Sequence, residues 1–585
     1  MSGPRPSRLG RPRVSLVDGG GGCDMRAAVT VAYLAAILAV GVIARRRRGG
    51  DEAFFLAGRT LGPLILLATM AATNFSGFTV LGFSGAGYRL GFAFYPVMAY
   101  GTGLMALSFL LIGVPAWRLG RRMGLITPPE LLTIRYGSRP LSVAFGAAMA
   151  VFTLPYLAIQ PMAAGYAMEG ILGLPYEAGA GLATALVLVY VLLGGLRAVA
   201  RTDVIQGAAM TALLAAGLFV VARASGGFAA GLESVADGSP EHFCRPGAGG
   251  GLAVGVWASY MLLWFLADPM FPQLFQRFYA ARGERSILRT MSLYPIMTGA
   301  LFFLPVAIGV LGRLHFPGLA ESETDQILPL LMDRFGGDWL PALAVAGLLG
   351  AILSTMDSQL LTLGSIVERD LLGLRAAAGR EGATGRRRAG PAARVTVAVL
   401  AVAGYLLALR PPATILAIAT ETFAGLAVLF PVVVAAIYWP RATSGWSLAS
   451  ILAGESAVVL YHFGLLPGFG LLPAIPAVAV SAAVLGVGGL VTREARPLPA
   501  FWREETTLPL ARQEKRLWAG LFLGFFILSV DWWRFGSPPR LVAGMPVWIF
   551  YFFGLCALLS IAYLALARRL AGKGRAARQA VPPLR

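Results

Sequence analysis

The sequence predicts an all-α polytopic membrane protein whose core is an inverted repeat of five plus five helices, with extra helices on both sides. Of the 585 residues, 57% are hydrophobic and 13% are charged, a composition typical of chains with many membrane spans and rare in soluble proteins. The chain also contains about fifteen apolar runs separated by loops. Two of these runs, five helices apart, are interrupted by polar residues or prolines, a pattern typical of membrane proteins built from inverted repeats.

Most of the apolar runs are long enough to cross a bilayer as a helix, which takes about 20 residues. They cover residues 27–44, 62–86, 91–115, 141–167, 177–194, 203–222, 252–274, 289–311, 340–366, 394–409, 412–438, 443–465, 470–491, 516–533 and 545–568. We therefore expect about fifteen transmembrane helices. The division of the chain follows from them: 1–24 as a disordered extension or a wrongly assigned start, 27–44 as an extra N-terminal helix, 62–222 as core repeat 1, 252–438 as core repeat 2, 443–568 as extra C-terminal helices, and 569–585 as a basic cytoplasmic tail.

The formal net charge of +20 would suit a nucleic-acid partner, but the positions of the arginines predict a membrane topology instead. Arginines gather in alternate loops between apolar runs, for example 45–48, 118–122, 277–285 and 386–388, and the loops between these carry few. Because cytoplasmic loops are enriched in Arg and Lys, this alternation predicts an N-terminus outside and a cytoplasmic C-terminus. No nucleic-acid partner is expected.

Two runs have interrupted centres. In the second run, small and polar residues occupy 70–77, and in the seventh run Asp268 is followed by Pro269 and Pro272. Proline removes a backbone donor and frees carbonyls, which a membrane tolerates only where they line a cavity or find other partners. Interrupted helices at corresponding places in two halves are typical of secondary transporters, whose substrate and ion sites lie at the breaks.

The run 340–366 carries the hydroxyls of Ser354, Thr355 and Ser358 and the carboxylate of Asp357. Residues three or four apart share one face of a helix, so these hydroxyls point the same way. Oxygen ligands of this kind suit a small hard cation, and a polar cluster in the bilayer predicts a functional site. The structural alternative is that Ser and Thr hold two packed helices together.

Several ordered motifs over roughly residues 27–490 resemble the sodium:solute symporter family. They are Leu61-Gly62-Pro63 before Asn74-Phe75-Ser76-Gly77, Gly195-Leu196-Arg197 with Thr202-Asp203-Val204-Ile205-Gln206-Gly207, Gln276-Arg277-Phe278-Tyr279-Ala280-Ala281, and Leu353-Ser354-Thr355-Met356-Asp357-Ser358-Gln359-Leu360. The resemblance implies a LeuT-like core that works by alternating access.

The resemblance also implies a Na⁺ site between the first and the eighth core helix. Carried over to this chain, backbone carbonyls of Ala72, Phe75 and Ala351 and hydroxyls of Ser354 and Thr355 would bind the ion. Na⁺ is thus the expected coupling ion.

The family's substrate positions fall in this chain near Trp264, Asp268 and Pro272 and, from the sugar symporters, on Glu421. Asn74 and Gln160 are further expected substrate contacts, and packing is the alternative role of Gln160. Asn74 stands where the proline symporters have an aspartate, which argues against proline as the substrate. The two carboxylates stand where a neutral-solute transporter would hold neutral groups, and each costs about 2.5–3.5 kcal/mol at mid-bilayer. A cationic or amine-bearing substrate, or a further Na⁺ or H⁺, is therefore expected. The structural alternatives are that Asp268 caps a half-helix and that Glu421 bonds a neighbouring helix.

Two further expectations concern acidic residues. Asp357 and Ser358 would hold a second cation or orient the sodium ligands, and a structural pairing of Asp357 with Gln160 stays open. Asp203 and Glu130 are expected at the cytoplasmic edge as loop and cap residues.

These observations predict a sodium-coupled symporter that imports a small polar organic solute and is not an enzyme. A proton-coupled symporter of the same fold and a transporter-like membrane sensor are the alternatives. The expected location is the bacterial inner membrane, with the solute and the lipid bilayer as partners and with either a monomer or a weak homo-oligomer as the assembly.

Overall fold

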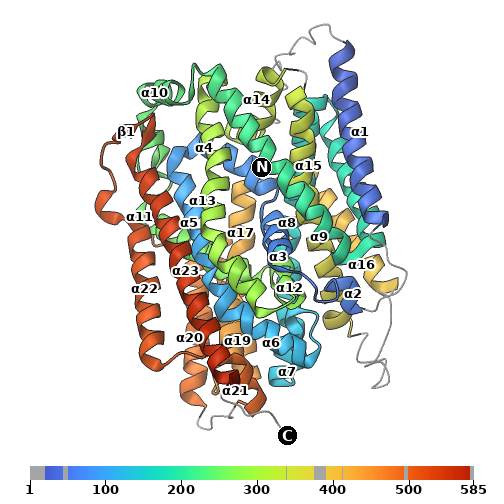
Figure 1. Cartoon of the computed structure of the whole chain (residues 1–585), viewed down its shortest axis with the longest axis vertical. Helices are drawn as coiled ribbons and strands as arrows, with labels where there is room; N and C mark the ends of the chain where they lie inside the picture. The colour runs from blue at the N-terminus through green and yellow to red at the C-terminus, as the bar shows by residue number, and fades with distance from the viewer. Residues whose placement is uncertain are drawn as a thin grey trace.

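The computed structural model describes residues 20–43, 51–337, 339–373, 391–411, 413–492 and 498–579. Over these residues the chain forms a bundle of helices that mostly run along one long axis (Figure 1). The predicted extension 1–24 lies largely outside the described residues, but its last residues do not form an extension. They are the first turn of α1 (Gly20–Ile43).

The first five-helix set opens with a broken helix. α3 starts at Pro63, whose fixed φ suits a first helical position, and it ends at Asn74, after which Phe75 leaves helical geometry (φ −90°, ψ 85°). A π-helical turn, Phe78–Gly82, leads into α4. α9 bends at Gly195, whose φ of 61° suits glycine, so that α9 supplies two helices of the set. The bounds are α4 (Phe83–Leu90), α5 (Phe94–Met105), a π-helical turn (Phe109–Gly113), α6 (Val114–Met123), α7 (Pro128–Tyr136), α8 (Arg139–Leu172) and α9 (Tyr176–Ala224).

The second set opens with a broken helix as well. α11 (Val254–Ala267) passes through a 3-10 turn, Asp268–Met270, into α12 (Pro272–Ala280), and the two parts are bent by 56°. Pro269 and Pro272 produce this break because neither can donate to a preceding carbonyl. The remaining helices are α13 (Glu284–His315), α14 (Ile327–Phe335), α15 (Trp339–Ile366), α16 (Pro391–Ala408), α17 (Ile415–Val428) and α18 (Phe430–Tyr438).

Further helices lie outside these two sets, and a two-stranded antiparallel hairpin joins α22 to α23. Their bounds are α2 (Asp51–Phe55), α10 (Phe228–Gly238), α19 (Ser444–His462), α20 (Ala474–Val491), α21 (Ala500–Thr506), α22 (Arg512–Val530), β1 (Leu541–Val542), β2 (Met545–Pro546) and α23 (Val547–Gln579).

Within the described residues, helix covers most of each of the fifteen apolar runs, but the number of spans is not confirmed as fifteen. Within the described residues, nine helical stretches are long and apolar enough to cross a membrane, and ten if the bent α11–α12 pair counts as one span. Four further apolar helices are shorter, at 10–17 residues, and α3 is one of them. The count differs because the break after Asn74 shortens one run, while Phe78–Met123 continues as one stretch through two runs.

α15 lies at the centre of the bundle and packs against α1, α8, α9, α12 and α16. All its residues from Ala344 to Ile366 are buried, so its hydroxyls and carboxylate face protein instead of lipid. Close helix packing elsewhere depends on small residues. At Gly309 of α13 an added Cβ would come within 2.0 Å of the Ser84 carbonyl of α4.

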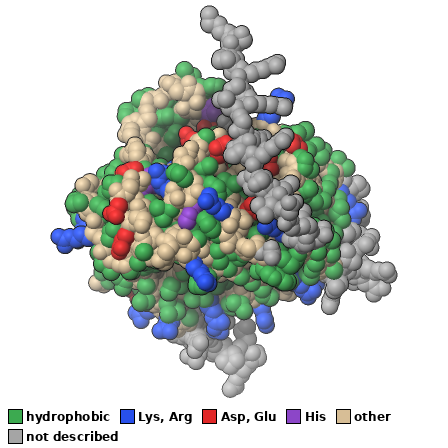
Figure 2. All heavy atoms as spheres, turned by 90° about the horizontal axis from the view of Figure 1, so that it is seen from above, with side chains coloured by type: hydrophobic (Ala, Val, Ile, Leu, Met, Phe, Trp, Pro, Cys, Tyr) green, Lys and Arg blue, Asp and Glu red, His purple; other side chains and the backbone are tan. Residues whose placement is uncertain are grey.

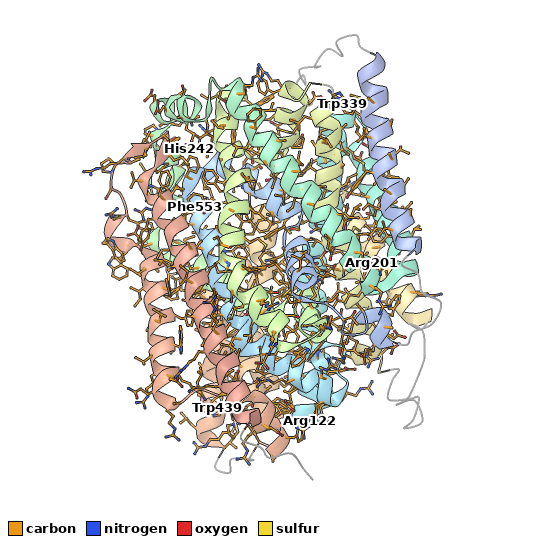
Figure 3. All side chains as sticks on the ribbon, viewed as in Figure 1. Arg122, Arg201, His242, Trp339, Trp439 and Phe553 are labelled. Carbon is orange, nitrogen blue, oxygen red and sulfur yellow. The ribbon has the colours of Figure 1, made fainter. Side chains whose placement is uncertain are left out.

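The two ends of the bundle differ in charge. Figure 2 looks onto the upper end, where carboxylates, arginines and histidines are interspersed, and His242 lies at this end in Figure 3. Arg122 and Trp439 lie at the lower end in Figure 3. The helices around Arg122 bring further basic residues there: Arg118, Arg121, Arg503, Arg569 and Lys573.

Candidate functional site

The break in α3 exposes the carbonyls of its last turn, which have no partner within the helix. Two hydroxyls of α15 donate hydrogen bonds to these carbonyls. The Ser354 hydroxyl donates to the Ala72 carbonyl at 2.7 Å and to the Ala351 carbonyl at 3.1 Å. The Thr355 hydroxyl donates to the carbonyls of Thr73, at 3.1 Å, and Ala351, at 3.3 Å.

The structure thus brings together four of the five residues expected around Na⁺, namely Ala72, Ala351, Ser354 and Thr355. The α3 carbonyl that contacts Thr355 is that of Thr73 and not that of Phe75. Both hydroxyls are fully buried. The donor set consists of oxygen atoms only, and rotation of the two hydroxyls would turn their lone pairs toward a bound ion. This chemistry fits Na⁺.

A buried charge cluster lies beside these hydroxyls. Arg277 of α12 approaches Asp203 of α9 at 3.2 Å and donates to the Ser358 hydroxyl at 2.8 Å and to the Thr69 hydroxyl at 3.0 Å. Asp357 accepts from the Tyr190 hydroxyl at 2.6 Å and from Ser358 at 3.0 Å. All the ionisable groups here are buried, with one guanidinium against two carboxylates. The cluster therefore has a place for one more positive charge or proton.

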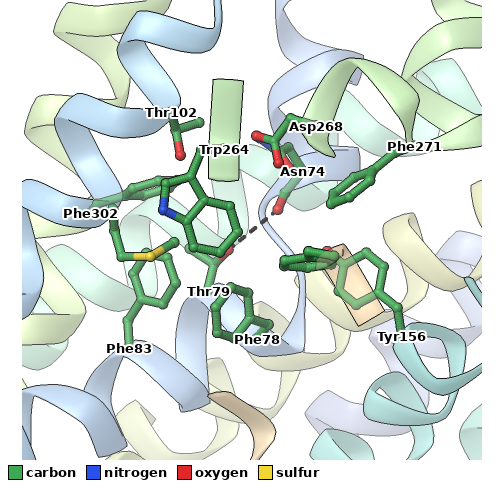
Figure 4. Close-up of a pocket in the computed structure, with 12 residues that line it drawn as sticks. Asn74, Phe78, Thr79, Phe83, Thr102, Tyr156, Trp264, Asp268, Phe271 and Phe302 are labelled. Atoms are coloured by element: carbon green, nitrogen blue, oxygen red, sulfur yellow. Dashed lines mark hydrogen bonds between the residues drawn. The ribbon is translucent and has the colours of Figure 1, made fainter. Parts of the chain in front are cut away.

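A small cavity lies between the two broken helices (Figure 4). Its empty volume is about 240 Å³. Its wall is mainly aromatic and comes from α3, α4, α5, α8, α11, α13 and α17. The lining residues are Asn74, Phe78, Thr79, Phe83, Met98, Thr102, Tyr156, Trp264, Asp268, Phe271, Phe302 and Phe423.

Phe423 of α17 organises this aromatic wall. Its ring lies 4.7 Å from that of Phe271, 5.0 Å from Tyr156, 5.3 Å from Trp264 and 6.0 Å from Phe78, measured between ring centroids. One aromatic side chain thus joins the two broken helices to α8, so that entry of a solute requires this cluster to move.

Asp268 is the one carboxyl group in the described lining of the cavity. It lies at the break after α11, is 2% exposed, and accepts from the Asn74 amide at 3.4 Å. Asn74 also donates to the Tyr294 hydroxyl at 3.1 Å. The lining contains no Arg, Lys or His among the described residues. The Trp264 indole N–H, which is also buried at this wall, has no hydrogen-bond partner in the described part of the chain. Carboxylate, indole N–H and aromatic faces together suit a small solute with a positive group.

The prediction that Glu421 lies at the substrate position is wrong. Its side chain is 67% exposed and lies 3.3 Å from His462 of α19. The physical reason is the helical period: two residues correspond to about 200° around the axis, so that Phe423 faces the cavity and Glu421 faces away. The charge expected from two carboxylates therefore comes from Asp268 alone.

The other predicted positions have different outcomes. Gln160 of α8 accepts from the Gly77 N–H at 3.2 Å and donates to the Tyr156 carbonyl at 3.2 Å, so it holds the α3 break and does not line the cavity. The pairing of Asp357 with Gln160 is wrong, because Asp357 bonds Tyr190. Glu130 caps α7 through the Ile126 and Thr127 N–H groups, as expected.

Asp203 is not an edge residue. It is fully buried and pairs with Arg277, and neither residue was predicted from the sequence as part of the site. A signal for both was present, because an ionisable residue within an apolar run predicts a partner inside the membrane. The identity of that partner depends on how the helices pack, because Asp203 and Arg277 are 74 residues apart in sequence.

Elements above and below the cavity are hydrogen-bonded to one another. At the lower side, the Leu61 and Arg282 backbones pair (2.8 Å), and Arg59 donates to the Leu125 carbonyl at 2.8 Å. At the upper side, Asp325, in the segment before α14, accepts from the first backbone N–H of α17, that of Ile415, at 2.9 Å. Burial raises the pKa of Asp325 to about 6, although the bond from Ile415 and the nearby Arg89 oppose this rise.

Comparison with known proteins identifies relatives over most of the chain. The model of the sodium:solute symporter family matches residues 54–454. The osmoregulated proline transporter OpuE of Bacillus subtilis is 27% identical over 485 residues, which cover 80% of this chain and 95% of that protein. The sodium/pantothenate symporter of Escherichia coli is 25% identical over 470 residues, covering 78% and 95%.

Solved structures are similar in fold. A Na⁺-coupled sialic acid symporter in a substrate-bound, outward-open state aligns with a TM-score of 0.65 at 17% identity, over 81% of this chain and 99% of that chain. A transporter of the nucleobase-cation-symport-1 family in a closed conformation aligns with a TM-score of 0.54 at 13% identity, over 78% and 98%. The fold is an inverted repeat, as the broken helices predicted, and it is LeuT-like, as the family resemblance implied.

Proposed function

The chain belongs to the sodium:solute symporter family, and we propose that it imports a small, positively charged organic solute together with Na⁺ by alternating access. The energy available is sufficient. One Na⁺ that moves down about 100 mV contributes about 2.3 kcal/mol, and a tenfold concentration gradient adds about 1.4 kcal/mol. Their sum supports several-hundred-fold accumulation of a neutral solute, and the membrane potential favours entry of a cation further.

For Na⁺ we propose the carbonyls of Ala72 and Ala351 and the hydroxyls of Ser354 and Thr355 as ligands. The carbonyl of Phe75, the fifth expected ligand, would bind the ion when the end of α3 shifts, because the backbone of Phe75 already lies outside helical geometry. This arrangement couples the ion to the cavity. The same end of α3 that would hold Na⁺ continues into Asn74, which bonds Asp268.

One observation supports a positively charged substrate. Asp268 is a buried carboxylate in an aromatic cavity whose described lining contains no basic residue. An uncompensated carboxylate is costly to bury, and a bound cation removes this cost. Aromatic faces attract cations in addition, most strongly quaternary ammonium groups. The sequence prediction of a cationic or amine-bearing substrate thus stands on one carboxylate instead of two.

A thermal-shift screen of the purified protein tests this proposal. The probes are choline, ethanolamine, proline, pantothenate and glucose, each with and without Na⁺. We expect the cationic probes to raise the melting temperature more than the others, and more strongly with Na⁺. Asp268→Asn should remove this response, whereas Glu421→Gln, which neutralises an exposed carboxylate, should preserve it. Stabilisation by neutral solutes alone, unchanged in Asp268→Asn, would contradict the proposed charge.

The second candidate is a proton-coupled symporter of the same fold. One observation favours it, namely the excess carboxylate among Asp203, Asp357 and Arg277, because Asp357 could carry a proton or a second cation. Uptake of a responding solute across Na⁺ concentrations and pH separates the two. If Asp357→Asn abolishes a pH dependence that persists without Na⁺, the proton is the coupling ion.

We further propose that the lower end of the bundle in Figure 1 faces the cytoplasm, with the N-terminus outside. The basic residues gathered at that end support this orientation through the positive-inside rule. A reporter fused after Arg569 should score as cytoplasmic in a bacterial inner membrane, and an external score would contradict the topology.

A further inference from the structure

The upper part of α22 is hydrogen-bonded to α5 and α11, and its lower end is ion-paired to α23 through Glu514. The Trp257 indole N–H of α11 donates to the Ser529 carbonyl at 2.9 Å, and the Tyr100 hydroxyl of α5 donates to the Phe525 carbonyl at 3.1 Å. An open groove lies between α22 and α5, α11 and the turn after α5, with an empty volume of about 1260 Å³ that includes space open to solvent. We call it the α22 groove.

The α22 side of this groove is one continuous helical stripe. It consists of Lys515, Trp518, Ala519, Phe522, Leu523 and Phe526, and each of these residues has another of them three or four positions away, which places them on one face of the helix. From Lys515 to Phe526 the helix rises about 16 Å. This length matches one leaflet of a hydrocarbon core about 30 Å thick.

The opposite wall is apolar as well. It contains Leu104 and Leu110 from the α5 region and Leu262 and Phe265 from α11. Lys515 is the one charged residue in the described lining, and it lies at the lower end of the stripe. Apolar walls over the length of a leaflet, ending in a single ammonium, fit an acyl chain whose headgroup lies at the membrane surface.

A second cavity, with an empty volume of about 670 Å³, continues the α22 groove at this end. The two cavities share Leu111, Leu508 and Lys515, and the second also contains Arg503 of α21. The basic groups nearby are divided. Glu514 pairs with both Arg569 and Lys573 of α23, and Arg122 pairs with Glu504 and Glu505.

Arg503 and Lys515, by contrast, form no ion pair with any residue that the structure describes, although they line a common cavity. Both side chains are exposed, so these two cations at the end of an apolar groove are free to bind an anion that carries a long apolar part. Basic pockets between helices at the cytoplasmic side of a membrane bind anionic lipid headgroups in this way.

We propose that the α22 groove binds an anionic phospholipid of the inner leaflet, with its phosphate on Arg503 and Lys515 and an acyl chain along the α22 stripe. The site is separate from the transport cavity, but the two share a helix. Leu262 and Phe265 of α11 contact the lipid site, and Trp264, between them in sequence, lines the transport cavity. A lipid in the groove thus supports the helix that carries Asp268 at its end.

The test is native mass spectrometry and thermal shift of the purified full-length protein, titrated with phosphatidylglycerol or with phosphatidylcholine of the same acyl chains. We expect phosphatidylglycerol to bind more tightly and to raise the melting temperature more. The double variant Arg503→Ala/Lys515→Ala should weaken phosphatidylglycerol binding about thirtyfold, to near the level of phosphatidylcholine. Arg516→Ala is the matched control, because this exposed arginine on the next position of α22 does not line either cavity.

Ala519→Trp tests the acyl part separately, since a bulky side chain at the centre of the stripe fills the groove. It should weaken both lipids while the melting temperature without lipid shows that the protein is folded. Should that variant fold poorly, Leu523→Trp, one turn further along the stripe, takes its place. Equal binding of the two lipids, an unchanged preference in the double variant, or full stabilisation by inorganic phosphate alone would each overturn the proposal.

Discussion

Replacement of Thr355 by valine removes one hydroxyl from the candidate Na⁺ site and keeps the shape of the side chain. The matched control is Thr298→Val on α13. Both hydroxyls are fully buried, and each donates to a carbonyl of its own helix and to one of a neighbouring helix. For Thr298 the neighbour is the Ala99 carbonyl at 2.9 Å, and for Thr355 it is the Thr73 carbonyl at 3.1 Å.

Both variants should lose similar stability without Na⁺, because each leaves a buried carbonyl without this partner, at a cost of about 1–3 kcal/mol. Only Thr355→Val should also change the response to Na⁺. A hydrogen-bonding oxygen that contacts a charged group contributes about 1.5–3 kcal/mol, which corresponds to a rise of about 10- to 100-fold in the apparent dissociation constant.

The assay is the melting temperature of the purified protein across Na⁺ concentrations, with choline-free potassium buffer to hold ionic strength constant. The wild-type protein and Thr298→Val should share one midpoint, and Thr355→Val should need far more Na⁺. Ser354→Ala, which removes the hydroxyl on Ala72, should behave as Thr355→Val does. The same Na⁺ midpoint for Thr355→Val and Thr298→Val would refute the site.

Three further predictions concern packing and charge. Arg277→Met should destabilise the protein by about 3–5 kcal/mol, because it leaves two buried carboxylates without a cation. Asp203→Asn should cost less, and it should partly rescue Arg277→Met. Thermal unfolding in detergent that gave the reverse order of stabilities would contradict the charge count. Gly309→Ala should cost about 1–3 kcal/mol by pushing α13 away from α4, whereas Gly554→Ala on α23, where an added Cβ meets nothing within 4 Å, should leave the melting temperature within a degree or two. Burial raises the pKa of Asp325 to about 6, so the folded protein binds a proton there more tightly than the unfolded chain does. The contribution of Asp325 to stability is therefore greatest below about pH 4 and falls by roughly 3 kcal/mol as the pH rises to about 6. Asp325→Asn should remove that part of the pH dependence, and parallel melting curves of variant and wild type from pH 4 to 7 would contradict it.

The sequence by itself determined where the helices lie and where two of them break. Hydropathy is a local property, and a proline such as Pro269 or Pro272 breaks a helix wherever the chain places it, so both features can be predicted without knowledge of neighbours. The common face of Ser354, Thr355 and Ser358 follows in the same way from the helical period. The family motifs then identified α3 as the partner of α15.

Only the tertiary structure decided which side chains meet inside the bundle. Hydropathy gave no reason to join Arg277 to Asp203, or Asp357 to Tyr190, because these pairs come from separate helices. That Phe423, and not Glu421 as predicted, faces the cavity has a related cause. An apolar helix such as α17 has no polar face that marks its orientation, so the direction of each side chain is set by packing against neighbours.

The number of spans and the α22 groove depend on tertiary structure for the same reason. An apolar run has the same sequence signal whether it crosses the bilayer, as α13 does by length and composition, or ends at a break, as α3 does. The groove lies between α22 and the α5 and α11 helices, to which α22 is hydrogen-bonded through Phe525 and Ser529. Gaps between helices arise from the angles at which they pack, and these angles are a property of the assembled bundle and of no single helix.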